Sequence, residues 1–169
     1  MTSLENIFEI GLEKDINNVI YLSIIYANND QIYMGAYNSS FSDKGRKIVE
    51  CAGNIEECLE ELYFKLNVNE YDLKKLNYNF MVIYDKDTKD QGKSLIKTIK
   101  EKIEGKISGV EVELKEVIVD NRGFEKRIKD INSGKYVLED DEIKREYEII
   151  PNYLKKSQAK RLLEKNNKN

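Results

Sequence analysis

Phe80-Met81-Val82-Ile83-Tyr84, followed by Asp85-Lys86-Asp87-Thr88-Lys89-Asp90, is the stretch that decides the fold of this 169-residue chain. A short apolar run that ends in a polar turn is typical of a buried strand. Behind the turn, apolar residues recur at helical spacing from Leu95 to Ile103, which predicts a helix packed over that strand. Open α/β sheets bind ligands beyond the carboxyl ends of their strands, so the acids that begin at Asp85 mark a candidate site.

The residues before this stretch predict three strands. Residues 19–27 are rich in Ile, Tyr and Val, and Asn28-Asn29-Asp30 after them is turn chemistry. Residues 31–37 then resume a strand pattern, which predicts a hairpin, and residues 46–50 predict a third short strand.

Helices are predicted where a capping residue precedes an apolar stripe. Thr2 and Glu5 fit a capping box for a helix at 2–14, and Asn54 caps a second helix. Thr88 and Gln91 fit a further capping box for the helix behind the buried strand.

The remainder of the chain predicts one more strand and several helices. Residues 110–119 alternate as a strand does, but the phase slips at Lys115-Glu116, which predicts a bulge there. Helices are expected after Asn121, at about 140–149, and in the basic C-terminal stretch. We therefore expect residues 1–150 to form a single α/β domain and residues 151–169 a basic C-terminal helix or tail.

The composition excludes several kinds of chemistry. The chain has no histidine, which removes Ser-His-Asp and Cys-His mechanisms and every His-ligated metal site. Cys51 and Cys58 match no zinc framework, and Cys58 falls on the apolar stripe of its helix, as a core residue does. Low cysteine use predicts a reducing, cytoplasmic setting. We expect no membrane association, because no apolar run approaches the roughly 20 residues of a membrane span.

Charge is unevenly distributed along a chain whose net charge is −3. Residues 152–169 contain six basic residues against one acidic residue, so an acidic body carries a basic tail. Either this tail is a solvated terminus, or it binds a partner, which would be a protein or a nucleic acid. Tyr33 and Tyr37 on the predicted hairpin are a second candidate contact, although cross-strand packing also explains them. The candidate binding residues are Tyr33, Tyr37, Lys155, Lys156, Lys160 and Arg161.

The order of these elements resembles that of the ribonuclease-H-like fold between about Val19 and Val119. That fold opens with an antiparallel three-strand meander, and a helix then leads to a strand parallel to the first. The resemblance implies an α/β fold with a mixed sheet of this order and helices on both faces. It also implies two Mg²⁺ or Mn²⁺ ions held by carboxylates that cut a phosphodiester bond.

The family's acid positions map onto this chain only in part. Asp85 matches the acid at the end of the fourth strand, Glu57 or Glu60 the helical Glu, and Asp140 or Asp141 the late acid. The first strand, however, contains no acid. Because that acid bridges both metals in the family, the resemblance implies a degenerate site.

A second resemblance, to the toprim pattern of primases and topoisomerases, rests on other residues. Ile48-Val49-Glu50 before one helix and Val82-Ile83-Tyr84-Asp85-Lys86-Asp87 before another are similar to its Glu and Asp-x-Asp motifs, which bind Mg²⁺. Cys51 stands where that pattern has a glycine.

Two hypotheses follow from the sequence. The first is a small non-catalytic binding or regulatory protein, a degenerate ribonuclease-H-like domain that acts through protein–protein contacts and needs no cofactor. The second is a Mg²⁺- or Mn²⁺-dependent phosphodiesterase acting on nucleic acid, with Asp85 and Asp87 as metal ligands and Glu50 or Glu57 assisting. For the acids at Asp85 and Asp87, ordinary helix-start chemistry is the competing explanation, since acids are favoured at a helix N-terminus.

Overall fold

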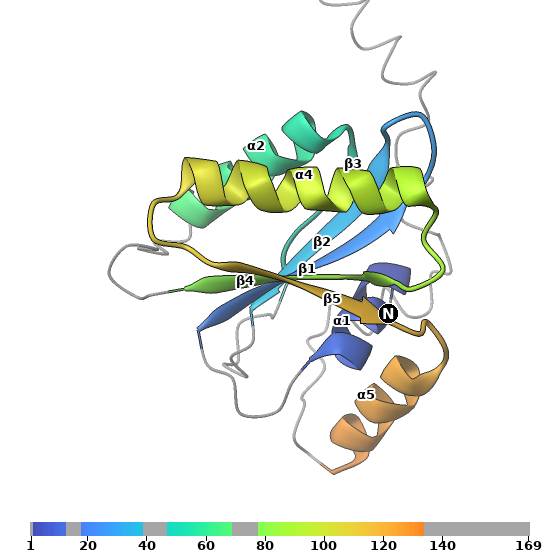
Figure 1. Ribbon diagram of the computed structural model, residues 1–169. Helices are drawn as coiled ribbons and strands as arrows, with labels where there is room; N and C mark the ends of the chain where they lie inside the picture. Colours follow the sequence, from blue (N-terminus) through green and yellow to red (C-terminus); the bar gives the residue numbers. More distant parts are fainter. Residues whose placement is uncertain (1, 13–17, 39–46, 69–77, 134–169) are drawn as a thin grey trace, which may run out of the picture.

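A computed structural model describes residues 2–12, 18–38, 47–68 and 78–133 of the chain, and it shows a mixed α/β fold. The strands are β1 (Val19–Tyr26), β2 (Ile32–Asn38), β3 (Lys47–Gly53), β4 (Asn79–Asp85) and β5 (Val112–Val117). The helices are α1 (Ser3–Gly11), α2 (Ile55–Val68), α4 (Asp90–Lys106) and α5 (Arg122–Asn132). The described helices lie on both faces of one open sheet (Figure 1).

The sheet has the order β3-β2-β1-β4-β5. β1 pairs antiparallel with β2, and β2 pairs antiparallel with β3, which confirms the predicted meander. β4 and β5 are parallel strands, joined to β1 and to each other in turn. The expected mixed sheet, with a meander followed by parallel strands, is therefore present.

Two apolar layers hold the helices against the sheet. On one face, α2 and α4 bury Leu62 and Ile99 against side chains such as Leu22 and Val82. On the other face, α1 buries Ile7 and Phe8 against β1, β2 and β4. β1 and β4 contribute side chains to both layers, which explains why their sequences are almost continuously apolar.

α1 is held in place by backbone carbonyls and by close contact with α5. The Lys115 ammonium donates to the Gly11 carbonyl at 3.1 Å, and the Lys126 ammonium donates to the Glu9 carbonyl at 2.8 Å. The Asn6 side-chain Nδ2 donates to the Asp120 carbonyl at 2.8 Å. At Gly123 the two helices come so close that an added Cβ would lie 2.6 Å from the Asn6 carbonyl oxygen.

Two local predictions are wrong. Thr88 does not cap α4, because the helix starts at Asp90 behind an N-cap at Lys89 that makes no side-chain capping bond. The Thr88 amide instead donates to the Asp85 carbonyl at 3.0 Å, within the turn that leaves β4. β5 has no bulge at Lys115-Glu116, since its parallel register with β4 is unbroken. The register shift in this sheet lies between Ala36 and Tyr37.

Other boundaries move by a few residues. α1 ends at Gly11 rather than at residue 14, while its capping box between Thr2 and Glu5 is confirmed. The helix predicted at 140–149 and the tail at 151–169 lie outside the described residues. None of the helices in the described ranges is long and apolar enough to cross a bilayer.

The close contact between α1 and α5 predicts that a methyl group added at Gly123 destabilises the fold. We expect Gly123→Ala to lower the free energy of unfolding by about 1–3 kcal/mol, because the methyl group must push α5 away from the α1 backbone. Urea denaturation followed by circular dichroism measures this change.

Gly105→Ala is the matched control for this substitution. A Cβ at Gly105, inside α4, would meet nothing within 4 Å. Alanine there should raise the free energy of unfolding by about 0.5–1 kcal/mol through its better helix propensity. Equal effects of the two substitutions would contradict the close approach of α1 and α5.

Candidate functional site

The pocket of interest lies where β1 and β4 end. It has a volume of about 380 Å³, and Asp85, Asp87, Thr88 and Lys89 line one side of it. Its other lining residues come from α1, from the end of β1 and from the segment after β5: Ser3, Ile7, Ile24, Ile25, Tyr26, Ala27 and Val119. The start of α1 thus covers the pocket that the candidate acids Asp85 and Asp87 line.

Asp85 is committed to a local turn. Its carboxylate accepts a hydrogen bond from the Asp87 amide at 3.0 Å, which is the geometry of an Asx turn. The backbone is fixed further because the Lys86 amide donates to the Val117 carbonyl at 2.9 Å. Asp85 is half-buried and Asp87 is exposed. The turn therefore presents two carboxylates to the pocket, and one oxygen of Asp85 already accepts a backbone bond.

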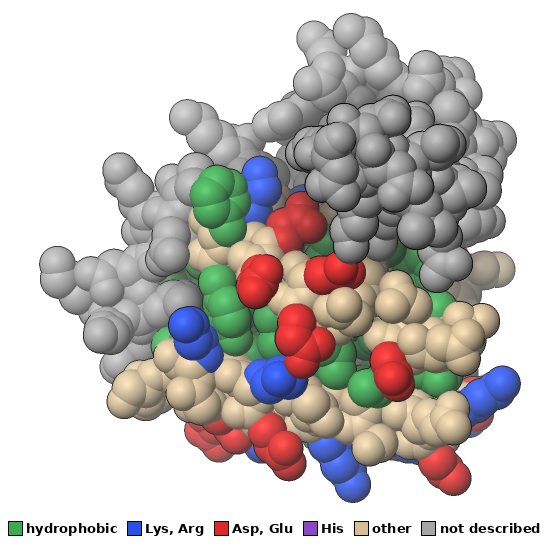
Figure 2. Space-filling model, turned by 90° about the horizontal axis from the view of Figure 1, so that it is seen from above, with side chains coloured by type: hydrophobic (Ala, Val, Ile, Leu, Met, Phe, Trp, Pro, Cys, Tyr) green, Lys and Arg blue, Asp and Glu red, His purple; other side chains and the backbone are tan. Residues whose placement is uncertain are grey.

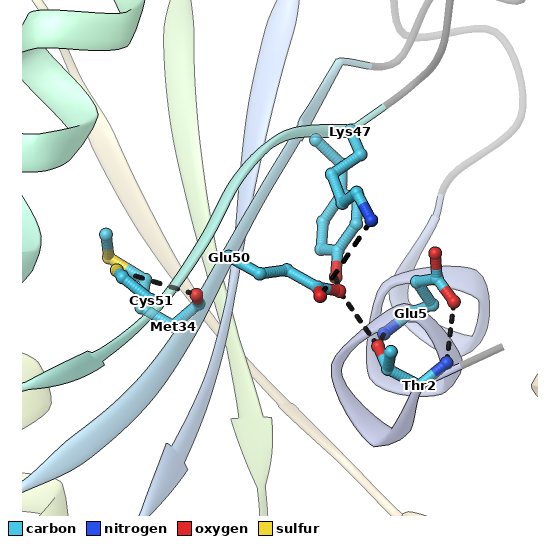
Figure 3. A network of polar contacts seen from close by, with 7 residues as sticks. Thr2, Glu5, Met34, Lys47, Glu50 and Cys51 are labelled. Atoms are coloured by element: carbon cyan, nitrogen blue, oxygen red, sulfur yellow. Dashed lines mark hydrogen bonds and ion pairs between the residues drawn. The ribbon is translucent and has the colours of Figure 1, made fainter. Parts of the chain in front are cut away.

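Glu50 faces α1 and lies away from this pocket. Its carboxylate accepts hydrogen bonds from the Thr2 hydroxyl at 2.9 Å and from the Tyr37 hydroxyl at 2.8 Å, and the Lys47 ammonium lies 3.9 Å from it. Figure 3 shows Glu50 pointing from β3 to the first residue before α1, whereas Cys51 points to the other side of the strand. Glu50 therefore connects the edge of the sheet to the start of α1.

The register of the sheet separates Glu50 from Asp85. Glu50 pairs with Gly35 and, through β2 and β1, shares a row with Ile83. Asp85 therefore lies two residues further along β4, and three strand spacings amount to about 14 Å. The two carboxylates cannot share one metal ion in this arrangement.

Glu57 belongs to yet another place in the fold. The Glu57 backbone amide donates to the Asn54 side-chain oxygen at 2.9 Å. In return, the Glu57 carboxylate accepts a hydrogen bond from the Asn54 backbone amide at 3.2 Å. This reciprocal pair confirms that Asn54 caps α2. Asp140 and Asp141 lie outside the described residues. Among the residues that the structure describes, no three acids or cysteines form a group that could hold a metal ion.

The hairpin tyrosines differ in their surroundings. Tyr37 is 1% exposed, and its ring stacks on Phe8 at a centroid distance of 4.7 Å. Burial first, and the negative charges of Glu50 and Glu5 next, raise the pKa of the Tyr37 hydroxyl well above its usual value. Tyr37 is thus a core residue under α1. Its ring occupies space that a side chain at position 35 would need, which Gly35 leaves free. Tyr33 is half-buried on the same face.

Lys155, Lys156, Lys160 and Arg161 lie outside the described residues. Cys58 is buried in the core beneath α2, as expected. A hydrogen bond with Cys58, and then burial, raise the pKa of the Cys51 thiol, so this thiol is a poor nucleophile.

One polar cluster has no counterpart in the sequence predictions. The Glu116 carboxylate accepts hydrogen bonds from the Lys93 ammonium at 3.1 Å and from the Tyr84 hydroxyl at 3.2 Å. These bonds, Lys93 first, lower the pKa of Glu116. The three residues come from α4, β4 and β5, so their proximity depends on the parallel pairing of the strands. Only a correct register of β4 against β5 could have revealed it.

The face covered by α2 and α4 carries charges of both signs. Figure 2 shows acidic side chains between the apolar ones, with basic side chains beside them. Lys102 of α4 forms an ion pair with Glu56 of α2 at 2.9 Å. The described part of this face therefore lacks the single-sign basic surface that nucleic-acid binding favours.

The Tyr37–Glu50 contact predicts a stability change that depends on pH. We expect Tyr37→Phe to lower the free energy of unfolding at pH 7 by about 1–3 kcal/mol, because a buried bond to a carboxylate is lost. The folded-state pKa of Tyr37 is raised, so its contribution is complete below the unfolded-state pKa near 10 and falls as the pH rises above it.

The difference between wild type and Tyr37→Phe should therefore shrink between about pH 10 and pH 12, as unfolded tyrosine ionises. Urea denaturation at several pH values measures it. Tyr26→Phe, which removes an exposed hydroxyl bonded to Gln91, is the control and should cost less at pH 7. A difference that grows with pH would contradict the raised pKa.

The chain matches no protein-family model and no curated protein.

Proposed function

We propose that this chain is a small, non-catalytic α/β binding or regulatory protein that acts through protein–protein contacts. The observation that carries the proposal is the dispersal of the candidate acids. Glu50 is bound to Thr2 and Tyr37, Glu57 is bound to Asn54 at the start of α2, and Asp85 and Asp87 are the only ones of these acids that line the pocket. Two-metal hydrolysis needs ligands that surround both ions, and two neighbouring carboxylates are too few.

The centre of β1 supports the same proposal. Ser23 is fully buried on the α1 side of the sheet, between Gly35 of β2 and Ile83 of β4. Its hydroxyl has no hydrogen-bond partner among the described residues. The first strand of an active ribonuclease-H-like enzyme carries a metal-bridging acid, whereas this strand is packed on both faces. The strand order β3-β2-β1-β4-β5 is compatible with a degenerate member of that fold.

The charge distribution supports a partner that is complementary to the tail. Residues 152–169 carry six basic residues and one acidic residue, although the whole chain has a net charge of −3. A basic segment attracts an acidic partner surface, whereas the acidic remainder of the chain repels the phosphates of a nucleic acid. We therefore assign the contact to Lys155, Lys156, Lys160 and Arg161, and the partner to an acidic protein surface.

Charge reversal of these four residues tests the assignment. The variant Lys155→Glu, Lys156→Glu, Lys160→Glu and Arg161→Glu should capture at least about tenfold less of its partners from a nuclease-treated lysate, because complementary charge is replaced by repulsion. Quantitative mass spectrometry of the captured proteins measures the change.

A control for charge reversal away from the tail changes two exposed lysines of α4, Lys97→Glu and Lys106→Glu. It should keep the partners of the wild type. Undiminished capture by the four-residue variant would overturn the tail as the contact. Capture that disappears with nuclease treatment alone would identify a nucleic acid as the partner.

A second candidate function is Mg²⁺- or Mn²⁺-dependent cleavage of nucleic acid, and the pocket favours it. Asp85 and Asp87 face a cavity at the carboxyl ends of β1 and β4, which is where open α/β sheets place ligands. Asp140 and Asp141 would have to supply the further oxygen ligands that a hard divalent cation requires.

Thermal melting with Mg²⁺ and Mn²⁺ separates the two functions. A metal site would raise the melting temperature by several degrees at about 100 times its Kd, since ligands that bind only the folded state stabilise it. Asp85→Asn and Asp87→Asn would remove that rise, and Glu113→Gln, at an exposed position of β5, would keep it. For the non-catalytic protein we expect no metal-dependent rise and no cleavage of labelled DNA or RNA.

A further inference from the structure

The outer side of α5 carries apolar side chains that the described residues leave uncovered. Phe124 is 38% exposed and Ile128, one turn later, is 58% exposed. We call Phe124 and Ile128 the α5 apolar surface.

This surface is separate from the contact between α5 and α1. Gly123 and Lys126 face α1, where Gly123 approaches Asn6 and Lys126 reaches Glu9. At 100° per residue, Phe124 and Ile128 lie roughly 100–140° round the helix from Gly123 and roughly 160–200° from Lys126. Figure 1 shows α5 beside α1, at the outer end of the sheet below β5. The helix therefore has one side that is already packed and an apolar flank that is available.

The chain itself supplies a segment that fits this flank. The described part ends at Ser133, one residue after α5, and 36 residues follow. Among them, Ile143, Tyr147 and Ile150 have the spacing i, i+4, i+7 of one helical face. A connection of a few residues after a helix favours an antiparallel neighbour, and a tethered segment has an effective concentration in the millimolar range.

Charge selects the same segment. Residues 139–150 contain six acidic residues and two basic ones, whereas α5 contains four basic residues and two acidic ones. Lys129 of α5 is exposed. The basic stretch beyond Pro151 lacks this complementarity, since it carries the same sign of charge as α5.

We propose that the acidic segment 139–150 docks antiparallel on the α5 apolar surface, with Ile143 against Ile128 and Tyr147 against Phe124. In this arrangement Pro151 ends the docked segment, and the basic residues beyond it remain available to a partner. The inference rests on the exposed apolar residues and on charge, so it is independent of the proposed function.

Hydrogen–deuterium exchange of the full-length protein tests the docking. Ile143→Ser with Tyr147→Ser should speed amide exchange in α5 by about tenfold, because local opening becomes easier when packing is lost. Leu162→Ser with Leu163→Ser, in the basic stretch, is the matched control and should leave α5 unchanged. The reverse pair, Phe124→Ser with Ile128→Ser, should speed exchange in residues 139–150, whereas Phe64→Ser, on the exposed side of α2, should not.

Two results would overturn the proposal. One is exchange in residues 139–150 that is as fast in the wild type as in the Phe124→Ser, Ile128→Ser variant. The other is a dimer, seen by sedimentation, that this variant dissociates while the Ile143→Ser, Tyr147→Ser variant does not, since that would assign the surface to a second copy. If one double variant fails to fold, the other still tests the contact from the opposite side.

Discussion

The burial of β1 between β2 and β4 is the constraint on which the rest of this structure depends. Its first six residues are all buried, and they alternate between the layer under α2 and α4 and the layer under α1. A strand that is apolar on both sides needs cover on both sides. α1 therefore has to cross the sheet, and the contacts that hold it, Glu50 among them, follow from that need.

The apolar patterns were sufficient for the strands and for most helices. Each predicted strand exists because its run of Ile, Val and Tyr has no other way to be buried, and the hairpin turn limits the register of β1 against β2. The errors at Thr88 and at Lys115-Glu116 have a common cause. Both predictions used local spacing alone, whereas the start of α4 depends on the turn that leaves β4, and β5 takes its register from β4.

In the candidate site, too, features set by neighbouring residues were predictable, and contacts between residues far apart in the chain were not. The acids at the end of β4 were visible in the sequence, and the structure places Asp85 and Asp87 on a pocket there. The role of Glu50 was not visible, because its partner Thr2 is 48 residues away and becomes a neighbour only when α1 covers the sheet. A carboxylate at the end of a strand is thus weak evidence for catalysis until the sheet register shows which other acids can reach it.

The contacts that hold α1 on the sheet have a consequence for synthesis on the ribosome. α1 is made before Lys115, Asp120, Gly123 and Lys126, the residues that contact it from β5 and α5 and from the segment between them. At typical translation rates, on the order of ten seconds separates the two. During that interval Ile7 and Phe8 are not yet fixed on the sheet by these contacts, which leaves the apolar face of α1 accessible to chaperones that recognise short apolar segments.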